Sequence, residues 1–223
     1  MLLIDYALIL ISATAISLIA NELRKYIKLP KLQRKSPYIL RCKSMIINNK
    51  LNPHTIIVGN SGQGKSKLAE YLVKGRNDIN VTLINCYSDD FASLTNVKRL
   101  TEIAEIMEYL GNVLNTAHKK PLYLIVDEVL ALSMQDKKVN KLLTTIVAKG
   151  RHHGVFLIVI AQYGTREELP FKNLVGNRIA FNMIEESNYK TILGFSPEIT
   201  QLQAREFCYL SSNGTGRSRC PKL

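Results

Sequence analysis

The chain has 223 residues, of which 30 are Lys or Arg and 18 are Asp or Glu, and its formal net charge is +12. Hydrophobic residues make up 46% of the sequence, which excludes an intrinsically disordered chain. The four cysteines are widely spaced and form no CxxC pair, which argues against a disulfide scaffold and against a cysteine-type zinc site.

The first 20 residues are almost entirely apolar, and Asp5 is the one charged residue among them. A membrane-spanning helix needs about 20 mostly apolar residues, so we expect residues 1–23 to form a transmembrane anchor. Two alternatives stay open. A signal peptide would need a basic segment before the apolar run, which is missing here, although Ala13 and Ala15 could mimic a cleavage site. A buried core helix is also possible, because Ser12, Thr14 and Ser17 dilute the apolar stripe.

A basic segment follows the apolar run. Residues 24–50 contain nine Lys or Arg residues and no Asp or Glu. Positive residues next to a span favour the cytoplasmic side, so the sequence predicts a single-pass membrane protein whose remaining chain is cytoplasmic. We interpret residues 24–50 as a basic juxtamembrane linker. The same charges could also contact anionic lipid or nucleic acid.

Residues 51–223 are predicted to form one α/β domain. Short apolar runs alternate with helical patterns there, as is typical of a parallel sheet flanked by helices. The expected strands cover residues 55–58, 81–85, 122–126, 155–161, 178–183 and 206–210. The expected helices cover residues 65–73, 101–118, 139–149 and 188–193.

A phosphate-binding motif lies between the first of these strands and the first helix. The sequence GNSGQGKS from Gly59 to Ser66 fits the Walker A pattern GxxxxGK[ST]. Its glycines let the backbone wrap around phosphate oxygens, and its N–H groups bind the anion. Lys65 is expected to reach the β- and γ-phosphates of ATP, and the Ser66 hydroxyl to bind Mg²⁺. The predicted nucleotide-binding residues are Gly59, Asn60, Ser61, Gly62, Gln63, Gly64, Lys65, Ser66 and Lys67.

The catalytic half of the predicted site follows two later strands. Asp127 and Glu128 come directly after the apolar run 122–126, which is the Walker B pattern. Asp127 is expected to hold Mg²⁺, and Glu128 to polarise the attacking water as a general base. Gln162 follows the strand 155–161, where it can contact the γ-phosphate or the water. The glutamate beside Asp127 favours hydrolysis over nucleotide binding alone.

These residues together resemble the FtsK–HerA superfamily of DNA-pumping ATPases. The likeness covers about residues 51–213 and includes two further stretches. In the stretch 149–162 an arginine-containing turn leads into the strand before Gln162. Residues 176–181 and 186–194 are similar to the family strand and the helix with its "SRTILG"-like signature.

The resemblance implies a RecA/FtsK-like P-loop fold that uses ATP and Mg²⁺. It also implies a homo-oligomeric ring, with six subunits as the expected number, that threads double-stranded DNA. An arginine from one subunit completes the neighbouring active site in this family, and Arg151 is the first candidate here, followed by Arg178. Their positive charge would offset the charge on the transferred phosphoryl group. Tyr87 and Lys98–Arg99 are candidate contacts to DNA in the pore.

The single expected span and the short chain resemble the packaging ATPases of icosahedral viruses with an internal membrane. The predicted function is therefore a membrane-anchored, ATP-hydrolysing motor that translocates double-stranded DNA during viral genome packaging. It would lie at a virion internal membrane or vertex, with viral vertex or membrane proteins as partners. A plasmid or conjugative DNA-transfer ATPase of the FtsK type is the alternative.

Two other classes stay open. A P-loop switch or small-molecule kinase at the membrane is one, although the chain has no NKxD-like guanine-reading segment and a kinase does not need the Asp127–Glu128 pair. The other is a membrane or virion scaffold that binds nucleotide without hydrolysing it.

Overall fold

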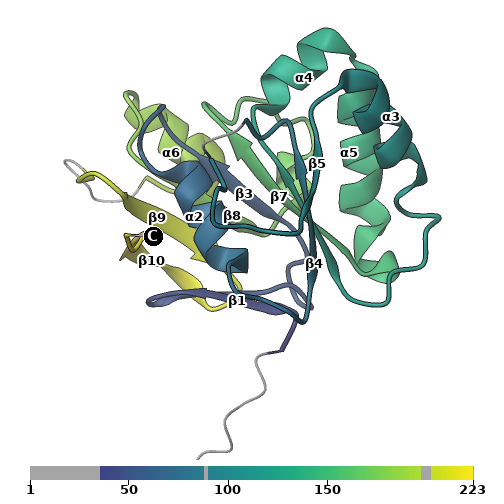
Figure 1. Cartoon of the computed structure of the whole chain (residues 1–223). Helices are drawn as coiled ribbons and strands as arrows, with labels where there is room; N and C mark the ends of the chain where they lie inside the picture. Colours follow the sequence, from purple (N-terminus) through teal and green to yellow (C-terminus); the bar gives the residue numbers. More distant parts are fainter. Residues whose placement is uncertain (1–35, 88–89, 197–201, 223) are drawn as a thin grey trace, which may run out of the picture. The chain divides into compact units, whose positions relative to one another are not determined.

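The computed structural model describes residues 36–87, 90–196 and 202–222, and its centre is an eight-stranded sheet (Figure 1). Six neighbouring strands run parallel, namely β8, β3, β7, β6, β4 and β5, whereas β9 and β10 are antiparallel to their neighbours. The predicted α/β class with a mostly parallel sheet is confirmed. The strand order is β10 (Gly214–Arg219), β9 (Glu206–Ser211), β8 (Asn177–Ala180), β3 (Thr55–Val58), β7 (Val155–Ala161), β6 (Leu122–Val126), β4 (Asn80–Ile84) and β5 (Lys98–Leu100).

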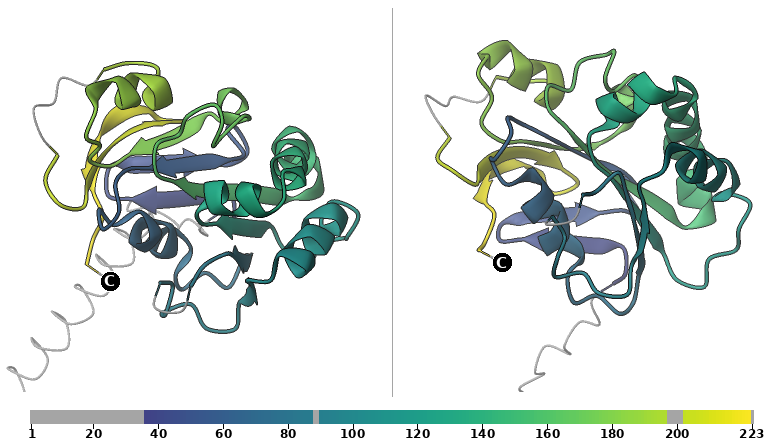
Figure 2. Two further views of the ribbon diagram at one scale, coloured as in Figure 1. Left: turned by 90° about the horizontal axis from the view of Figure 1, so that it is seen from above. Right: turned by 45° about the horizontal axis from the view of Figure 1, so that its top comes forward.

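Helices cover both faces of this sheet (Figure 2), which is why its central strands are apolar throughout. On β7, Phe156, Ile158 and Ile160 share a core cluster with α2, whereas the alternate residues of β7 share the other cluster with α3 and α5. Alternation follows from the two-residue period of a strand. The helices are α2 (Lys65–Val73), α3 (Ile103–Asn112), α4 (Val129–Gln135), α5 (Lys138–Lys149) and α6 (Glu186–Leu193).

A β-hairpin occupies part of the segment that we predicted to be a linker. The strands β1 (Ile39–Cys42) and β2 (Met45–Asn48) pair antiparallel around a turn in which Lys43 has φ +50°. Their inward residues are fully buried and pack on the α2 side of the sheet, while the basic residues point outward. The compact unit therefore begins at Pro37, not at the predicted residue 51. The inward residues are Leu40, Cys42, Met45 and Ile47.

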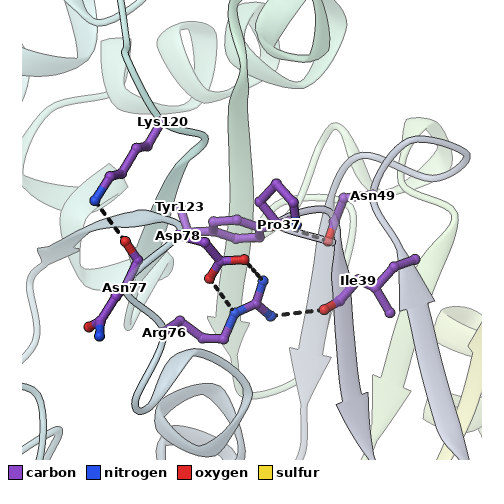
Figure 3. A network of polar contacts seen from close by, with 8 residues as sticks. All are labelled: Pro37, Ile39, Asn49, Arg76, Asn77, Asp78, Lys120 and Tyr123. Carbon is purple, nitrogen blue, oxygen red and sulfur yellow. Dashed lines mark hydrogen bonds and ion pairs between the residues drawn. The ribbon is translucent and has the colours of Figure 1, made fainter. Parts of the chain in front are cut away.

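Polar contacts join this hairpin to the sheet (Figure 3). The Tyr123 hydroxyl on β6 lies 2.8 Å from the Pro37 carbonyl and 3.1 Å from Asn49 Oδ1. Arg76 donates to the Ile39 carbonyl at 2.9 Å, and its guanidinium is held by a salt bridge to Asp78. Buried polar atoms that are paired in this way fix the hairpin in one position.

The predicted helix over 101–118 is shorter in the structure. The helix α3 ends at Asn112, because side chains beyond it take over its last carbonyl groups. The Thr116 hydroxyl donates to the Asn112 carbonyl at 3.2 Å, and His118 Nε2 lies 2.9 Å from the Val113 carbonyl. Such contacts satisfy carbonyls that the helix leaves without a partner.

Besides the β1–β2 hairpin, the elements β5, α4 and β10 were also not predicted. The strand β5 has three residues and α4 has seven, too few for a clear periodic pattern. Among the described residues, no helix has the length and apolar character needed to cross a bilayer. The predicted anchor at 1–23 lies outside the described residues.

A buried histidine links β3 to β7 and α5. His54 is 1% exposed, accepts a hydrogen bond from the Leu157 N–H at 3.0 Å, and packs against Gly150. Burial lowers the pKa of His54 from 6.5 to about 4, because it disfavours the charged ring.

We expect this histidine to destabilise the fold in acid. The unfolded chain takes up a proton near pH 6.5 and the folded chain only near pH 4, so stability is fully present above pH 6.5 and falls as the pH drops towards 4. The loss should reach about 3 kcal/mol. Urea unfolding of wild type and His54→Asn between about pH 4.5 and 7.5 measures it. Other titrating groups act in both proteins, so an equal pH slope in the two would contradict the prediction.

Candidate active site

The phosphate-binding loop joins β3 to α2, as predicted. Its glycines adopt positive φ angles: +145° at Gly59, +74° at Gly62 and +100° at Gly64. Glycine reaches these angles without the strain that a Cβ would cause. Gly64 precedes α2 and no side chain caps it, so the first N–H groups of α2 are open to an anion.

Two backbone hydrogen bonds attach the loop to the ends of neighbouring strands. The Gly59 N–H donates to the Gln162 carbonyl after β7 at 3.2 Å, and the Asn60 N–H donates to the Asn182 carbonyl after β8 at 3.1 Å. The fit is close: a Cβ on Gly59 would lie 2.6 Å from the Cβ of Phe181.

Lys65 folds back over this loop. Its ammonium group donates to the Gly59 carbonyl at 2.7 Å and to the Asn60 carbonyl at 2.9 Å. Burial lowers the pKa of Lys65, and the charges of Asp127 and other nearby acids partly offset that shift. A partly desolvated ammonium group beside open helix N–H groups is suited to bind phosphate.

The structure brings Ser66 and Asp127 together. The Ser66 hydroxyl donates to Asp127 Oδ2 at 3.1 Å. Burial raises the pKa of Asp127 to about 6, and hydrogen bonds from Ser66 and the Glu128 N–H oppose that shift. A hydroxyl and a half-buried carboxylate are hard oxygen ligands, so this pair fits Mg²⁺.

Glu128 has a strained backbone. It adopts the left-handed conformation, with φ +48° and ψ 53°, and its N–H donates to Asp127 Oδ1 at 2.9 Å. The carbonyl of Asp127 accepts a hydrogen bond from Asn85 Nδ2 at 3.1 Å. A non-glycine residue in this region costs about 1–2 kcal/mol. This turn places an exposed glutamate side chain directly after the carboxylate of Asp127.

These groups line one cavity of about 260 Å³. It contains Lys65, Glu128 and Gln162, three of the four predicted catalytic residues, and both predicted Mg²⁺ ligands. Gly59, Asn60 and Gln63 complete the loop without lining the cavity. The full lining is Ser61, Gly62, Gly64, Lys65, Ser66, Lys67, Asp90, Asp127, Glu128, Ile160, Ala161 and Gln162.

Three residues near this cavity were not predicted. Asp90 lines it, and its charge acts on both Lys65 and Asp127. Arg205 lies behind Gly64, with its Cγ 3.6 Å from the position that a Cβ on that glycine would take. Glu168 is buried behind Gln162. No motif marks any of them, because their positions depend on loops whose paths the sequence pattern does not indicate.

The candidate arginines lie away from the cavity of their own chain. Arg151 is exposed on a short 3₁₀ turn before β7, at the opposite end of that strand from Gln162. Arg178 is half-buried, and its guanidinium donates to the carbonyls of Val175 at 2.8 Å and Ile192 at 3.0 Å. The guanidinium of Arg178 is thus engaged within its own chain. The role of Arg151 across a subunit contact stays a prediction.

The candidate DNA contacts differ in their surroundings. The Tyr87 side chain is 62% exposed, beyond the end of β4. Lys98 lies over the ring of Tyr109, 4.4 Å from its centroid, and Arg99 donates to the Phe91 carbonyl at 2.9 Å. All three residues are exposed, and their role in DNA binding stays a prediction.

Comparison of the sequence with protein-family models and with curated proteins gave no match. Solved structures do share the fold. The pCW3 conjugation coupling protein TcpA, in its monomer form with ATPγS, matches with a TM-score of 0.62 and 15% identity over 81% of this chain and 64% of its own. Thermomonospora curvata EccC (ATPases 2 and 3), in complex with a signal sequence peptide, matches with a TM-score of 0.66 and 13% identity, over 88% of this chain and 42% of its own.

A third match is the genome packaging NTPase B204 from Sulfolobus turreted icosahedral virus 2, in complex with ATPγS. Its TM-score is 0.58 at 17% identity, over 78% of this chain and 100% of its own. The chain thus spans less than two thirds of TcpA and less than half of EccC, but the whole of B204. At 13% to 17% identity these solved structures share the fold of this chain, and the predicted α/β fold is confirmed.

A pair of glycine variants tests the geometry of the loop. Gly59→Ala should destabilise the protein by about 2 kcal/mol or more and abolish nucleotide binding, because its Cβ meets Phe181. Gly62→Ala meets no atom within 4 Å and should cost about 1 kcal/mol of backbone strain. Thermal unfolding and titration with a fluorescent ATP analogue measure both effects. Equal losses in the two variants would show that packing against Phe181 is unimportant.

Proposed function

We propose that the protein is an ATP-hydrolysing motor that translocates double-stranded DNA. The observation that carries this proposal is the single cavity in which Lys65, Ser66, Asp127, Glu128 and Gln162 meet. This set contains a phosphate-binding lysine, two oxygen ligands for Mg²⁺, a general base and a polar sensor. The solved neighbours with ATPγS bound support ATP as the nucleotide.

Each residue has a chemical task in this proposal. Lys65 and the N–H groups at the start of α2 hold the phosphates and offset their charge. Ser66 and Asp127 would hold Mg²⁺, which when bound neutralises charge on the β- and γ-phosphates. Glu128 accepts a proton from the attacking water, and Gln162 orients that water or the γ-phosphate.

DNA translocation is the finer part of the proposal. Two of the neighbours are a conjugation coupling protein and a genome packaging NTPase. The net charge of +12 supports contact with DNA phosphates. We favour viral genome packaging, because the fold of this chain covers all of B204 but only part of TcpA. Conjugative transfer is the second candidate, since TcpA matches with the higher TM-score.

We also propose that residues 1–23 anchor the motor in a membrane, with the ATPase domain on the cytoplasmic side or at a virion internal membrane or vertex. The apolar run and the basic residues after it support this placement. The motor is proposed to act as a homo-oligomeric ring, with six subunits as the expected number. Viral vertex or membrane proteins are its proposed partners.

Replacement of the general base should separate binding from hydrolysis. Glu128→Gln should reduce ATP turnover by about a hundredfold or more while nucleotide affinity is kept, because the amide cannot accept the proton. Lys65→Ala should lose both ATP turnover and nucleotide affinity. Phosphate release by the full chain, with and without double-stranded DNA at low and moderate salt, measures this. Turnover that DNA does not stimulate would favour a switch or kinase, and full activity of Glu128→Gln would contradict the assigned base.

Mixing two inactive variants tests Arg151 as the residue supplied by a neighbouring subunit. Arg151→Ala and Glu128→Gln should each be inactive, and their mixture should regain part of the turnover. Some contacts then pair an intact Glu128 with an intact Arg151 of the next subunit. The control mixes Glu128→Gln with Lys65→Ala, which should stay inactive because both residues belong to one cavity. Absence of recovery in the first mixture would contradict the role of Arg151.

A further inference from the structure

A buried carboxylate organises the loop that follows β7. Glu168 is 2% exposed, and its two oxygens accept hydrogen bonds from three consecutive backbone N–H groups. The distances are 2.9 Å from Gln162, 3.1 Å from Tyr163 and 2.7 Å from Gly164. The Glu168 N–H donates in turn to Thr165 Oγ1 at 3.2 Å. The loop from residue 162 to 168 therefore closes around a single side chain.

The partners of this carboxylate indicate what it does. Within the described part of the chain, the salt bridges do not include Glu168. Burial of a charged group is costly unless hydrogen bonds compensate it, and here the compensation comes from three backbone N–H groups. An uncharged side chain with a single carbonyl oxygen could not accept hydrogen bonds from all three N–H groups as well as the two oxygens of a carboxylate do. The arrangement fixes a segment of backbone and leaves Glu168 no access to a nucleotide.

The fixed segment includes the sensor. The N–H of Gln162 is held by Glu168, and its carbonyl accepts the hydrogen bond from Gly59, the first residue of the phosphate-binding loop. The backbone of Gln162 is thus held on both sides, which places its side chain at the cavity. The next residues are also confined, because a Cβ on Gly164 would lie 2.2 Å from Ile192 of α6.

The charge of the same carboxylate also reaches Lys65. This charge favours the protonated form of Lys65, against the effect of burial. One buried group therefore influences both the sensor and the phosphate-binding lysine, although it touches neither side chain in the hydrogen bonds of the described residues.

We infer that Glu168 is a positioning residue that holds the Gln162 backbone in register with the phosphate-binding loop, so that the Gln162 side chain can report the γ-phosphate. This inference rests on the proposed ATPase function. A residue that acts through Gln162 should matter only while Gln162 is present, and it should matter more for ATP than for ADP. A role limited to folding has neither property.

The test combines four variants of the full chain. Glu168→Gln leaves one oxygen acceptor and adds a donor that faces three N–H groups. Glu167→Gln is the matched control, since this neighbouring acid is exposed. Gln162→Ala and the double variant complete a double-mutant cycle. We would measure kcat, KM, the affinities for ATPγS and ADP, and thermal unfolding.

We expect Glu168→Gln to lower kcat by about tenfold or more with KM within about threefold, as for a misplaced group in an otherwise intact site. Its preference for ATPγS over ADP should fall to that of Gln162→Ala. The double variant should be no slower than Gln162→Ala alone, and Glu167→Gln should match wild type. Unchanged kcat in Glu168→Gln, or effects of the two variants that multiply, would overturn the inference.

Two further measurements keep the outcomes distinct. If Glu168→Gln does not fold, Glu168→Asp carries the same cycle, because it keeps the charge and shortens the side chain by one methylene. If wild type binds ATPγS but does not hydrolyse ATP, the proposed function fails. The ATPγS-to-ADP preference then still decides on Glu168: a preference equal to wild type overturns its role, and one equal to Gln162→Ala supports it.

Discussion

The strands β3, β7 and β8 end side by side, and the position of the phosphate-binding loop depends on this alignment. Val58, the last residue of β3, pairs with Ala161 of β7 on one side and with Ala180 of β8 on the other. Because the three strands end side by side, the N–H groups of Gly59 and Asn60 donate to carbonyls that follow the two neighbouring strands, those of Gln162 and Asn182. The phosphate-binding loop is thus attached to the ends of both neighbouring strands.

Opposed charges in a small volume are the second constraint. Burial raises the pKa of Asp127 and lowers that of Lys65, so burial disfavours the charged form of each group, and the charge of Asp127 partly offsets the shift of Lys65. Under the proposed function, phosphates beside Lys65 and Mg²⁺ beside Asp127 would favour both charged forms. Nucleotide would then also stabilise the fold, in proportion to its affinity.

The sequence alone predicted the central strands and the residues of the cavity, because the Walker patterns have fixed spacing and continuous apolar runs mark covered strands. The β1–β2 hairpin was missed because its strands have four residues each, which is too short for a clear period of two, and in β2 the outward residue Ile46 is as apolar as its buried neighbours. Glu168 could not be found, because its partners are backbone N–H groups of a loop without periodic pattern.

The hairpin at the start of the compact unit has a mechanical consequence. It is bound to β6 through Tyr123, to the segment before β4 through Arg76, and to the turn between β9 and β10, where Ser212 accepts from the Asn48 N–H at 2.8 Å. A pull on the chain at Pro37 is therefore shared among the sheet centre and both of its flanks. Tyr123 lies near the start of β6, whereas Asp127 and Glu128 follow its end, so the contact that holds Pro37 is at the opposite end of this strand from the hydrolytic groups.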